Sequence, residues 1–248
     1  MKRLWLLLLA VALAAGCAGR GNTPAFHAIP TEATAERGSA AAFDHALDHP
    51  ESGYYPLNDY FNMESGGSLH ILTGFETLQQ TKSYTCGAAA AQMVLHWFGE
   101  DGYDERSLAA VLGSNDTHGT TVEAVRDFFE DLGWNVIANA GTQPYFADAE
   151  TFVSYAVRRL DEGTPLLVDW EDWDGHWQVI VGIDTMDPLS VYDDVLIFAD
   201  PCDVSDHWQD GYSTFSAARF FHMWREGPCS ENDPPYVQSF VIAHPSGG

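Results

Sequence analysis

Apolar and polar residues alternate with different periods in the two halves of the chain. Between residues 86 and 163, apolar residues recur every three or four positions, which predicts amphipathic helices. We expect these helices at residues 86–99, 104–113, 121–134 and 148–163. The first contains an alanine run and has no clear polar face, so it should be central and buried.

The second half contains short apolar runs that are bounded by Gly, Asp and Pro, a pattern typical of strands. The expected strands lie at residues 69–75, 164–170, 176–184, 194–201 and 236–245, and residues 212–224 should form a helix. Because the helices largely precede the strands, the fold class should be α+β, with an N-terminal helical part packed on a C-terminal antiparallel sheet.

The N-terminus has the composition of a targeting segment. Lys2 and Arg3 precede an apolar run at residues 4–13 that is long enough for a signal peptide and short for a bilayer span. The following letters, AAGC, resemble the lipobox of bacterial lipoproteins, which implies cleavage before Cys17 and lipidation of its thiol. An ordinary secretory signal is the alternative, and both place the mature chain outside the cytoplasm.

Three regions follow from these patterns: a lipoprotein signal peptide at 1–17, a flexible tether at 18–52 and one folded domain at 53–248. The tether is rich in Ala, Gly, Ser, Thr and Pro and shows no sustained period. A lipid on Cys17 would anchor the protein in the cell envelope, and we expect the periplasmic face of the outer membrane.

The strongly acidic charge excludes several kinds of partner. Lys and Arg number 11 against 36 Asp and Glu, for a net charge of −25. Nucleic-acid binding needs cationic contacts to phosphates, so it is not expected. An anionic bilayer surface would also repel the domain, so contact with the membrane should run through the N-terminal lipid only. We expect a monomer that needs no cofactor or metal.

Cys86 is the first candidate for chemistry, because it stands at the start of the buried helix. The unpaired N–H groups and the dipole of a helix N-terminus favour a thiolate there. Gly87 leaves room for a substrate backbone, and the side-chain amide of Gln80 could donate a hydrogen bond to an oxyanion. The alternative is that Cys86 is a buried structural cysteine.

A nucleophilic cysteine needs a base and a group that orients the base. His176 begins a predicted strand directly after Gly175, and Asp200 ends the next one before Pro201. Adjacent antiparallel strands bring the start of one beside the end of the next, so His176 and Asp200 can be neighbours. Each residue taken singly would more often be a hydrated loop residue.

Several segments together resemble papain-like C39 and C39-like cysteine peptidases. The stretch QTKSYTCGAAAAQMVLHWFG is similar to their Gln-x5-Cys-Gly-x-Ala segment, and GHWQVIVGID and LIFADP are similar to their histidine and Asp-Pro segments. GYSTFSAARFFHMW resembles a later stretch of the family. The resemblance covers about residues 70–226, and the order Cys, His, Asp is also the order of the family.

The resemblance implies a papain-like fold and a catalytic triad. Cys86 would be the nucleophile, His176 the general base and acid, Asp200 the residue that orients the histidine, and Gln80 part of the oxyanion hole. Gln79 is a rival for the last role. The gap between His176 and Asp200 is longer than usual in the family, which makes Asp193 and Asp194 lesser rivals to Asp200.

The expected function is therefore an extracytoplasmic cysteine peptidase that cleaves a peptide or protein substrate through an acyl-enzyme. Acyl transfer on the same triad is one alternative, and a non-catalytic peptide-binding lipoprotein is the other. The best-known members of the family cut double-glycine leader peptides while fused to a transporter. This chain shows no transporter, so that substrate is not expected here.

Two further features have structural explanations. In an oxidising compartment Cys202 and Cys229 should form a disulfide, although with His207 and His222 they also have side chains suited to Zn²⁺. The acidic stretch DWEDWDGHW at 169–177 should be a solvated turn with tryptophan anchors, and a Ca²⁺ site or a substrate-binding lip is the alternative.

Overall fold

The computed structural model describes residues 58–172, 175–186, 190–204, 210–224 and 237–247. The predicted signal peptide, its Cys17 and the predicted tether lie outside the described residues. Within the described ranges, no helix combines the length and apolar character that crossing a membrane requires.

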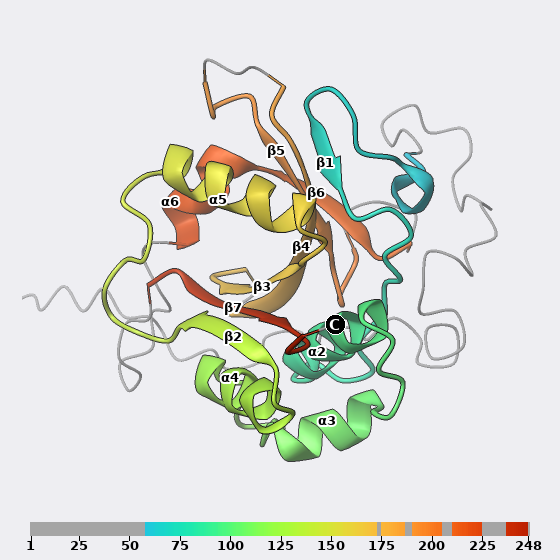
Figure 1. Ribbon diagram of the computed structural model, residues 1–248. Coiled ribbons are helices and arrows are strands. Elements are labelled where there is room, and N and C mark those ends of the chain that lie inside the picture. The colour runs from blue at the N-terminus through green and yellow to red at the C-terminus, as the bar shows by residue number, and fades with distance from the viewer. Residues whose placement is uncertain (1–57, 173–174, 187–189, 205–209, 225–236, 248) are drawn as a thin grey trace, which may run out of the picture.

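An antiparallel sheet forms the centre of the domain (Figure 1). Its strands follow the order β2-β7-β3-β4-β5-β6, and β1 pairs with β4 outside this path. The strands are β1 Leu69–Ile71, β2 Asn135–Asn139, β3 Leu166–Trp170, β4 His176–Asp184, β5 Val195–Ala199, β6 Tyr212–Ser216 and β7 Ser239–His244.

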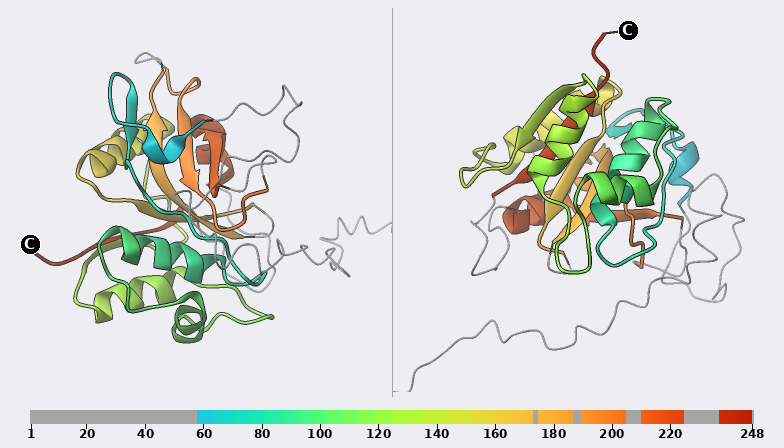
Figure 2. Two further views of the ribbon diagram at one scale, coloured as in Figure 1. Left: turned by 90° about the vertical axis from the view of Figure 1, so that its right-hand side faces the viewer. Right: turned by 90° about the horizontal axis from the view of Figure 1, so that it is seen from below.

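Helices cover the sheet on both sides. Figures 1 and 2 show α2, α3 and α4 together on one side, whereas α5 and α6 lie on the other. The helices are α2 Cys86–Trp97, α3 Glu105–Val111, α4 Val122–Asp131, α5 Ala149–Asp161 and α6 Ala217–Trp224, and a short 3-10 helix, η2, spans Tyr60–Asn62.

Local sequence explains where most helices begin. Asp104, Thr121 and Asp148 each accept a hydrogen bond from a backbone N–H of the first turn that follows, in α3, α4 and α5 respectively. Helix α2 differs, because Thr85 precedes it without such a side-chain bond. The N-terminus of α2 therefore keeps N–H groups that no capping side chain satisfies.

The two faces of the sheet can be told apart by two tryptophans. On β3, the ring of Trp170 contacts Phe220 of α6, with centroids 5.1 Å apart. On β4, the indole N–H of Trp177 donates to the carbonyl of Thr120, just before α4, at 2.8 Å. Since successive side chains of a strand point to opposite faces, Trp170 marks the α6 face and Trp177 the α2 and α4 face.

The α+β class with an antiparallel sheet is confirmed. One local prediction is wrong, and one strand was missed. Residues 212–224 are not one helix, because the first five form β6, which pairs with β5 from Ala199 to Val195. In this short segment, alternation of residues within YSTF gives a strand before the helical period begins. Strand β2 at 135–139 was not predicted; it is an edge strand of only five residues that pairs with β7.

Candidate active site

Cys86 is the first residue of α2, as predicted, and its side chain is almost completely buried. The next residue, Gly87, lies tightly against Thr120, since a methyl group at Gly87 would come within 2.5 Å of the Thr120 side chain. This close approach explains why glycine follows the cysteine. It also packs the N-terminus of α2 against the loop that precedes α4.

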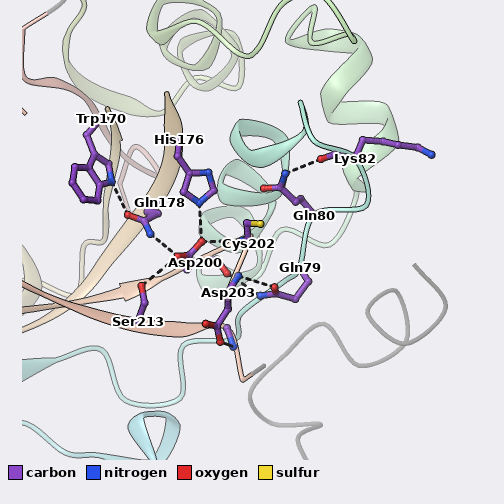
Figure 3. A network of polar contacts seen from close by, with 11 residues as sticks. Gln79, Gln80, Lys82, Trp170, His176, Gln178, Asp200, Cys202, Asp203 and Ser213 are labelled. Atoms are coloured by element: carbon purple, nitrogen blue, oxygen red, sulfur yellow. Dashed lines mark hydrogen bonds and ion pairs between the residues drawn. The ribbon is translucent and has the colours of Figure 1, made fainter. Parts of the chain in front are cut away.

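His176 and Asp200 meet because of the register between β4 and β5. Val179 of β4 pairs with Ala199 of β5, which brings the first residue of β4 close to the residue just after β5. The Nε2 atom of His176 lies 2.8 Å from Oδ1 of Asp200, and both residues are buried (Figure 3). This contact leaves Nδ1 as the ring nitrogen free to serve a second partner.

The thiol of Cys86 acts on the same imidazole. Burial by itself would lower the pKa of His176, but the carboxylate of Asp200 and the side chain of Cys86 outweigh burial and hold this pKa well above its ordinary value. An imidazolium between a carboxylate and a sulfur is therefore favoured at neutral pH. The structure thus brings together the three residues that the sequence pattern singled out.

Asp200 is held by more donors than the histidine alone. Its Oδ1 also accepts the backbone N–H of Cys202 at 2.8 Å, and its Oδ2 accepts from Gln178 at 2.6 Å and from the Ser213 hydroxyl at 3.3 Å. Burial would raise the pKa of Asp200, but His176, the Cys202 N–H and Gln178 together place it below its ordinary value. The carboxylate therefore stays ionised.

Gln178 is a site residue that the sequence reasoning missed. Trp170 donates to its Oε1 at 2.7 Å, which directs its amide nitrogen at Asp200 (Figure 3). A signal existed, because Gln178 follows His176 by two positions and so shares its face of β4. A buried glutamine within an apolar strand is itself a sign of a polar network.

The two glutamines before Cys86 have different surroundings. Both ends of the Gln79 amide are used inside the protein, since Nε2 donates to the carbonyl of Asp200 at 2.8 Å and Oε1 accepts the N–H of Asp203 at 3.0 Å. Gln80 donates one N–H to the carbonyl of Lys82 at 2.7 Å. An amide nitrogen carries two N–H groups, so each glutamine keeps one N–H without an acceptor among the described residues.

The loop between Gln80 and Cys86 is fixed at both ends. The backbone N–H of Gln80 donates to the carbonyl of Pro201 at 2.7 Å, which ties the loop to the turn after Asp200. Glu105, at the start of α3, accepts the N–H and the hydroxyl of Thr81 at 2.7 and 3.0 Å and also accepts the hydroxyl of Thr85. Glu105 was not predicted, because its role depends on the packing of α3 beside the loop.

The lesser rivals to Asp200 lie elsewhere. Asp194 immediately precedes β5, whose first residue, Val195, pairs with Asp184 at the far end of β4 from His176. Asp193 is exposed one residue further away. Neither can contact the His176 ring across the length of the strand, so Asp200 alone of these three aspartates reaches it.

Cys202 is a second buried thiol beside the site. Burial, together with the nearby carboxylate of Asp200, raises the pKa of Cys202 to about 12, so this thiol stays neutral. It is free in the structure, and Cys229 lies outside the described residues, so their disulfide stays a prediction. The zinc alternative also involves His207 and Cys229, both outside the described residues, and no group of three or more possible metal ligands occurs in the described part.

A cysteine at the head of a central helix, facing a histidine and an aspartate on an antiparallel sheet, is the arrangement of papain-like proteins. Residues 72–227 match the Peptidase_C39 like family. The match covers more than half of the chain, and the chain belongs to this family. The papain-like fold expected from the sequence is thereby confirmed.

Among solved structures, the chain is similar to the peptidase domain of Streptococcus ComA, a bifunctional ABC transporter involved in a quorum-sensing pathway. The two share 17% identity over 68% of this chain and 96% of that chain, with a TM-score of 0.46. No curated protein matches the chain.

Proposed function

We propose that this protein is an extracytoplasmic cysteine peptidase that uses Cys86, His176 and Asp200 as its catalytic triad. The observation that carries the proposal is the buried 2.8 Å contact between His176 and Asp200, with the Cys86 thiol acting on the same imidazole. A base that is oriented by one residue and faces a nucleophile on its other side defines such a triad.

In the first half of the reaction, the thiolate of Cys86 attacks the carbonyl carbon of a peptide bond. A thioester forms as the C–N bond breaks, and the His176 imidazolium gives its Nδ1 proton to the departing amine. Asp200 holds Nε2 throughout, so that Nδ1 keeps facing the sulfur. The four donors around Asp200 keep that carboxylate in place.

The tetrahedral intermediate carries a negative oxygen that needs donors. The backbone N–H of Cys86 is at the N-terminus of α2, where no side-chain cap competes for it. The remaining N–H of Gln80 supplies the second donor in this proposal. Gln79 also keeps a second N–H, but both ends of its amide are bonded to the segment that begins at Asp200, so the proposal assigns the role to Gln80.

In the second half, water replaces the amine and attacks the thioester. His176, now neutral, accepts a proton from the water through Nδ1, and the C–S bond breaks to give the free carboxylic acid and the Cys86 thiolate beside the His176 imidazolium, as at the start. No cofactor or metal enters either half. The substrate class is a peptide or protein, as expected for a member of the C39-like family.

The cellular setting in this proposal is the periplasmic face of the outer membrane. The charged start, the apolar run and the AAGC letters at residues 1–17 support lipidation of Cys17. Residues 18–52 would then serve as the tether. Metabolic labelling with a palmitate analogue tests this step separately, since replacement of Cys17 by serine should abolish the label.

The test of the peptidase function is digestion of an N-acetylated peptide library by the full-length protein, followed by mass spectrometry. Cys86→Ala should lower cleavage at least a thousandfold, because no other group can form the thioester. Cys202→Ala, compared in the presence of a reducing agent so that no disulfide differs between the proteins, is the matched control. It removes the other buried thiol of the described part, keeps the backbone N–H that Asp200 accepts and should cleave at close to the normal rate.

Three results would contradict the hydrolase proposal. Cleavage that survives in Cys86→Ala would show that another residue reacts. Products joined to an added amine, in place of free acids, would indicate an acyltransferase. Tight peptide binding without turnover would indicate a non-catalytic binding protein.

A further inference from the structure

Asp169 on β3 is a carboxylate that the proposed mechanism does not use. In the described part of the chain its side chain has no hydrogen-bond or ion-pair partner, although it is only partly exposed to solvent. A carboxylate in such a place is expensive unless something compensates its charge. Unpaired ionisable groups beside a reactive site are candidates for ligand binding.

The position of Asp169 places it on the side of the sheet that carries Cys86. Asp169 pairs with Trp177 across β3 and β4, so both side chains point to the same face. Trp177 contacts the carbonyl of Thr120, and the Thr120 side chain packs against Gly87, the residue after Cys86. A continuous set of contacts therefore leads from the neighbour of Asp169 to the nucleophile.

Gly175 lies next to the carboxylate of Asp169. A methyl group at Gly175 would lie 3.8 Å from Oδ1 of Asp169, and the backbone there has a φ of 108° that favours glycine. Gly175 directly precedes His176, so Asp169 lies beside the start of β4. The charge on His176 acts on Asp169, which places this carboxylate close to the proposed triad.

The charge of Asp169 responds to its surroundings. Burial raises the pKa of Asp169 to about 7, and the charge on His176 acts in the opposite direction. Trp177 on β4 and Ser239 on β7, which flank Asp169 in the sheet, carry no charge. A cation placed against the carboxylate would favour its ionised form and would be bound most tightly above neutral pH.

We propose that Asp169 binds the ammonium or guanidinium group of a substrate residue next to the cleaved bond, and that it selects Lys or Arg there. This inference rests on the proposed peptidase function. It assigns to Asp169 a specificity role and no part in proton transfer. The ligand supplies the charge partner that Asp169 lacks within the described part of the chain.

The first test measures access to Cys86 by reagents of different charge and does not depend on peptidase activity. The reagents are trimethylammonium-ethyl, methyl and sulfonato-ethyl methanethiosulfonate, and mass spectrometry follows the Cys86 peptide at pH 8. We expect the cationic reagent to react about tenfold faster than the anionic one, relative to their rates with a free thiol, because a carboxylate stands nearby. Asp169→Asn should remove most of this preference.

A matched control removes the same charge elsewhere. Asp131→Asn changes an exposed residue at the end of α4 and should leave the ratio of rates unchanged. An equal loss of preference in both variants would show that the general negative charge of the protein is responsible, which overturns the role of Asp169. Failure of all three reagents to reach Cys86 would overturn it too.

The second test uses N-acetylated peptides, which carry no α-amine, so that any preference for a cation must come from a side chain. Peptides with Lys or Arg near the cleaved bond should have a kcat/KM about tenfold above those with Gln or norleucine, and Asp169→Asn should abolish the difference. A preference that appears only with free N-termini would show that Asp169 binds the α-amine, which contradicts the side-chain assignment.

The two tests separate the inference from the function on which it rests. Cleavage without any dependence on Asp169 would overturn the inference and leave the peptidase intact. A charge preference at Cys86 that depends on Asp169, in a protein that cleaves no peptide, would support cation binding and overturn the peptidase.

Discussion

Replacement of Asp169 by Asn should stabilise the protein, and the gain should appear only as pH rises. The folded state holds the pKa of Asp169 at about 7 because burial disfavours its charge, whereas the ordinary value is 3.8. Between these two values the unfolded chain has lost the proton and the folded chain keeps it. Unfolding free energy therefore falls as pH rises through this window in the native protein.

The size of the effect follows from the two pKa values. Each unit by which the pKa of Asp169 is raised lowers the free energy of unfolding at high pH by about 1.4 kcal/mol. The rise of this pKa to about 7 therefore corresponds to a loss of at most about 4 kcal/mol. Asp169 is partly exposed, and contact with water weakens the penalty, so we expect about half of this, or about 2 kcal/mol, at pH 8. For a domain of this size that gain raises Tm by about 4–8 °C.

The assay is urea unfolding of the native protein and Asp169→Asn at pH values from 4 to 8. The difference in unfolding free energy should be smallest at pH 4, where the unfolded chain has only partly lost the Asp169 proton, and should reach its plateau above pH 7. Asp131→Asn, at an exposed site, should show no such rise. Groups distant from Asp169 titrate equally in the native and Asp169→Asn proteins, so the difference reports on Asp169 and on His176, whose charge acts on it.

A flat difference between pH 4 and pH 8 would refute the reasoning. It would mean that the carboxylate is fully solvated or is paired in solution, and either state would leave it no need of a cation. If Asp169→Asn were less stable than the native protein at pH 8, the charge of Asp169 would stabilise the fold, which also contradicts a role in binding.

Two further predictions concern the N-terminus of α2. Glu105→Ala should lower kcat at least tenfold, because it releases the loop before Cys86. Glu105→Gln keeps an accepting oxygen and should retain most of the activity. Steady-state kinetics on one peptide measures both variants, and equal losses of kcat would contradict an anchoring role for Glu105. Gly87→Ala should lower the free energy of unfolding in urea by about 1–3 kcal/mol, because its new methyl group would overlap Thr120. Gly102→Ala, with open space around it, should lower this free energy far less. Equal losses in the two variants would contradict the packing of Gly87 against Thr120.

The sequence predicted that His176 and Asp200 would be neighbours, because strand ends carry local signals. Gly175 before His176 and Pro201 after Asp200 mark where two apolar runs stop, and antiparallel neighbours bring those ends together. The same logic located Cys86, since an alanine-rich helix without a polar face must be buried. These positions follow from patterns within each segment.

The supporting residues were harder to predict because they depend on contacts between distant segments. Ser213 lies on β6, a segment that was predicted as part of the following helix. Its contact with Asp200 could therefore not be predicted. Gln79 and Gln80 look alike in sequence, yet only Gln79 has both ends of its amide bonded within the fold. Hydrogen-bond partners of this kind are set by sheet register and loop packing, which no local period encodes.

Two carboxylates near His176 have different environments, and these suit the different tasks that we propose for them. Asp200 accepts hydrogen bonds from three side chains and one backbone N–H, which lowers its pKa and makes it a permanent anion. Asp169 receives no such bonds in the described part of the chain, and burial raises its pKa to about 7.

A carboxylate that orients a catalytic base must stay charged and immobile, and Asp200 meets that need. A carboxylate that selects a cationic substrate must instead keep its oxygens available, because donors from the protein would occupy the atoms that the ligand has to reach. Asp169 has no hydrogen-bond donor among the described residues, which the proposed binding role requires, and the destabilisation that this causes at alkaline pH is the measurable consequence.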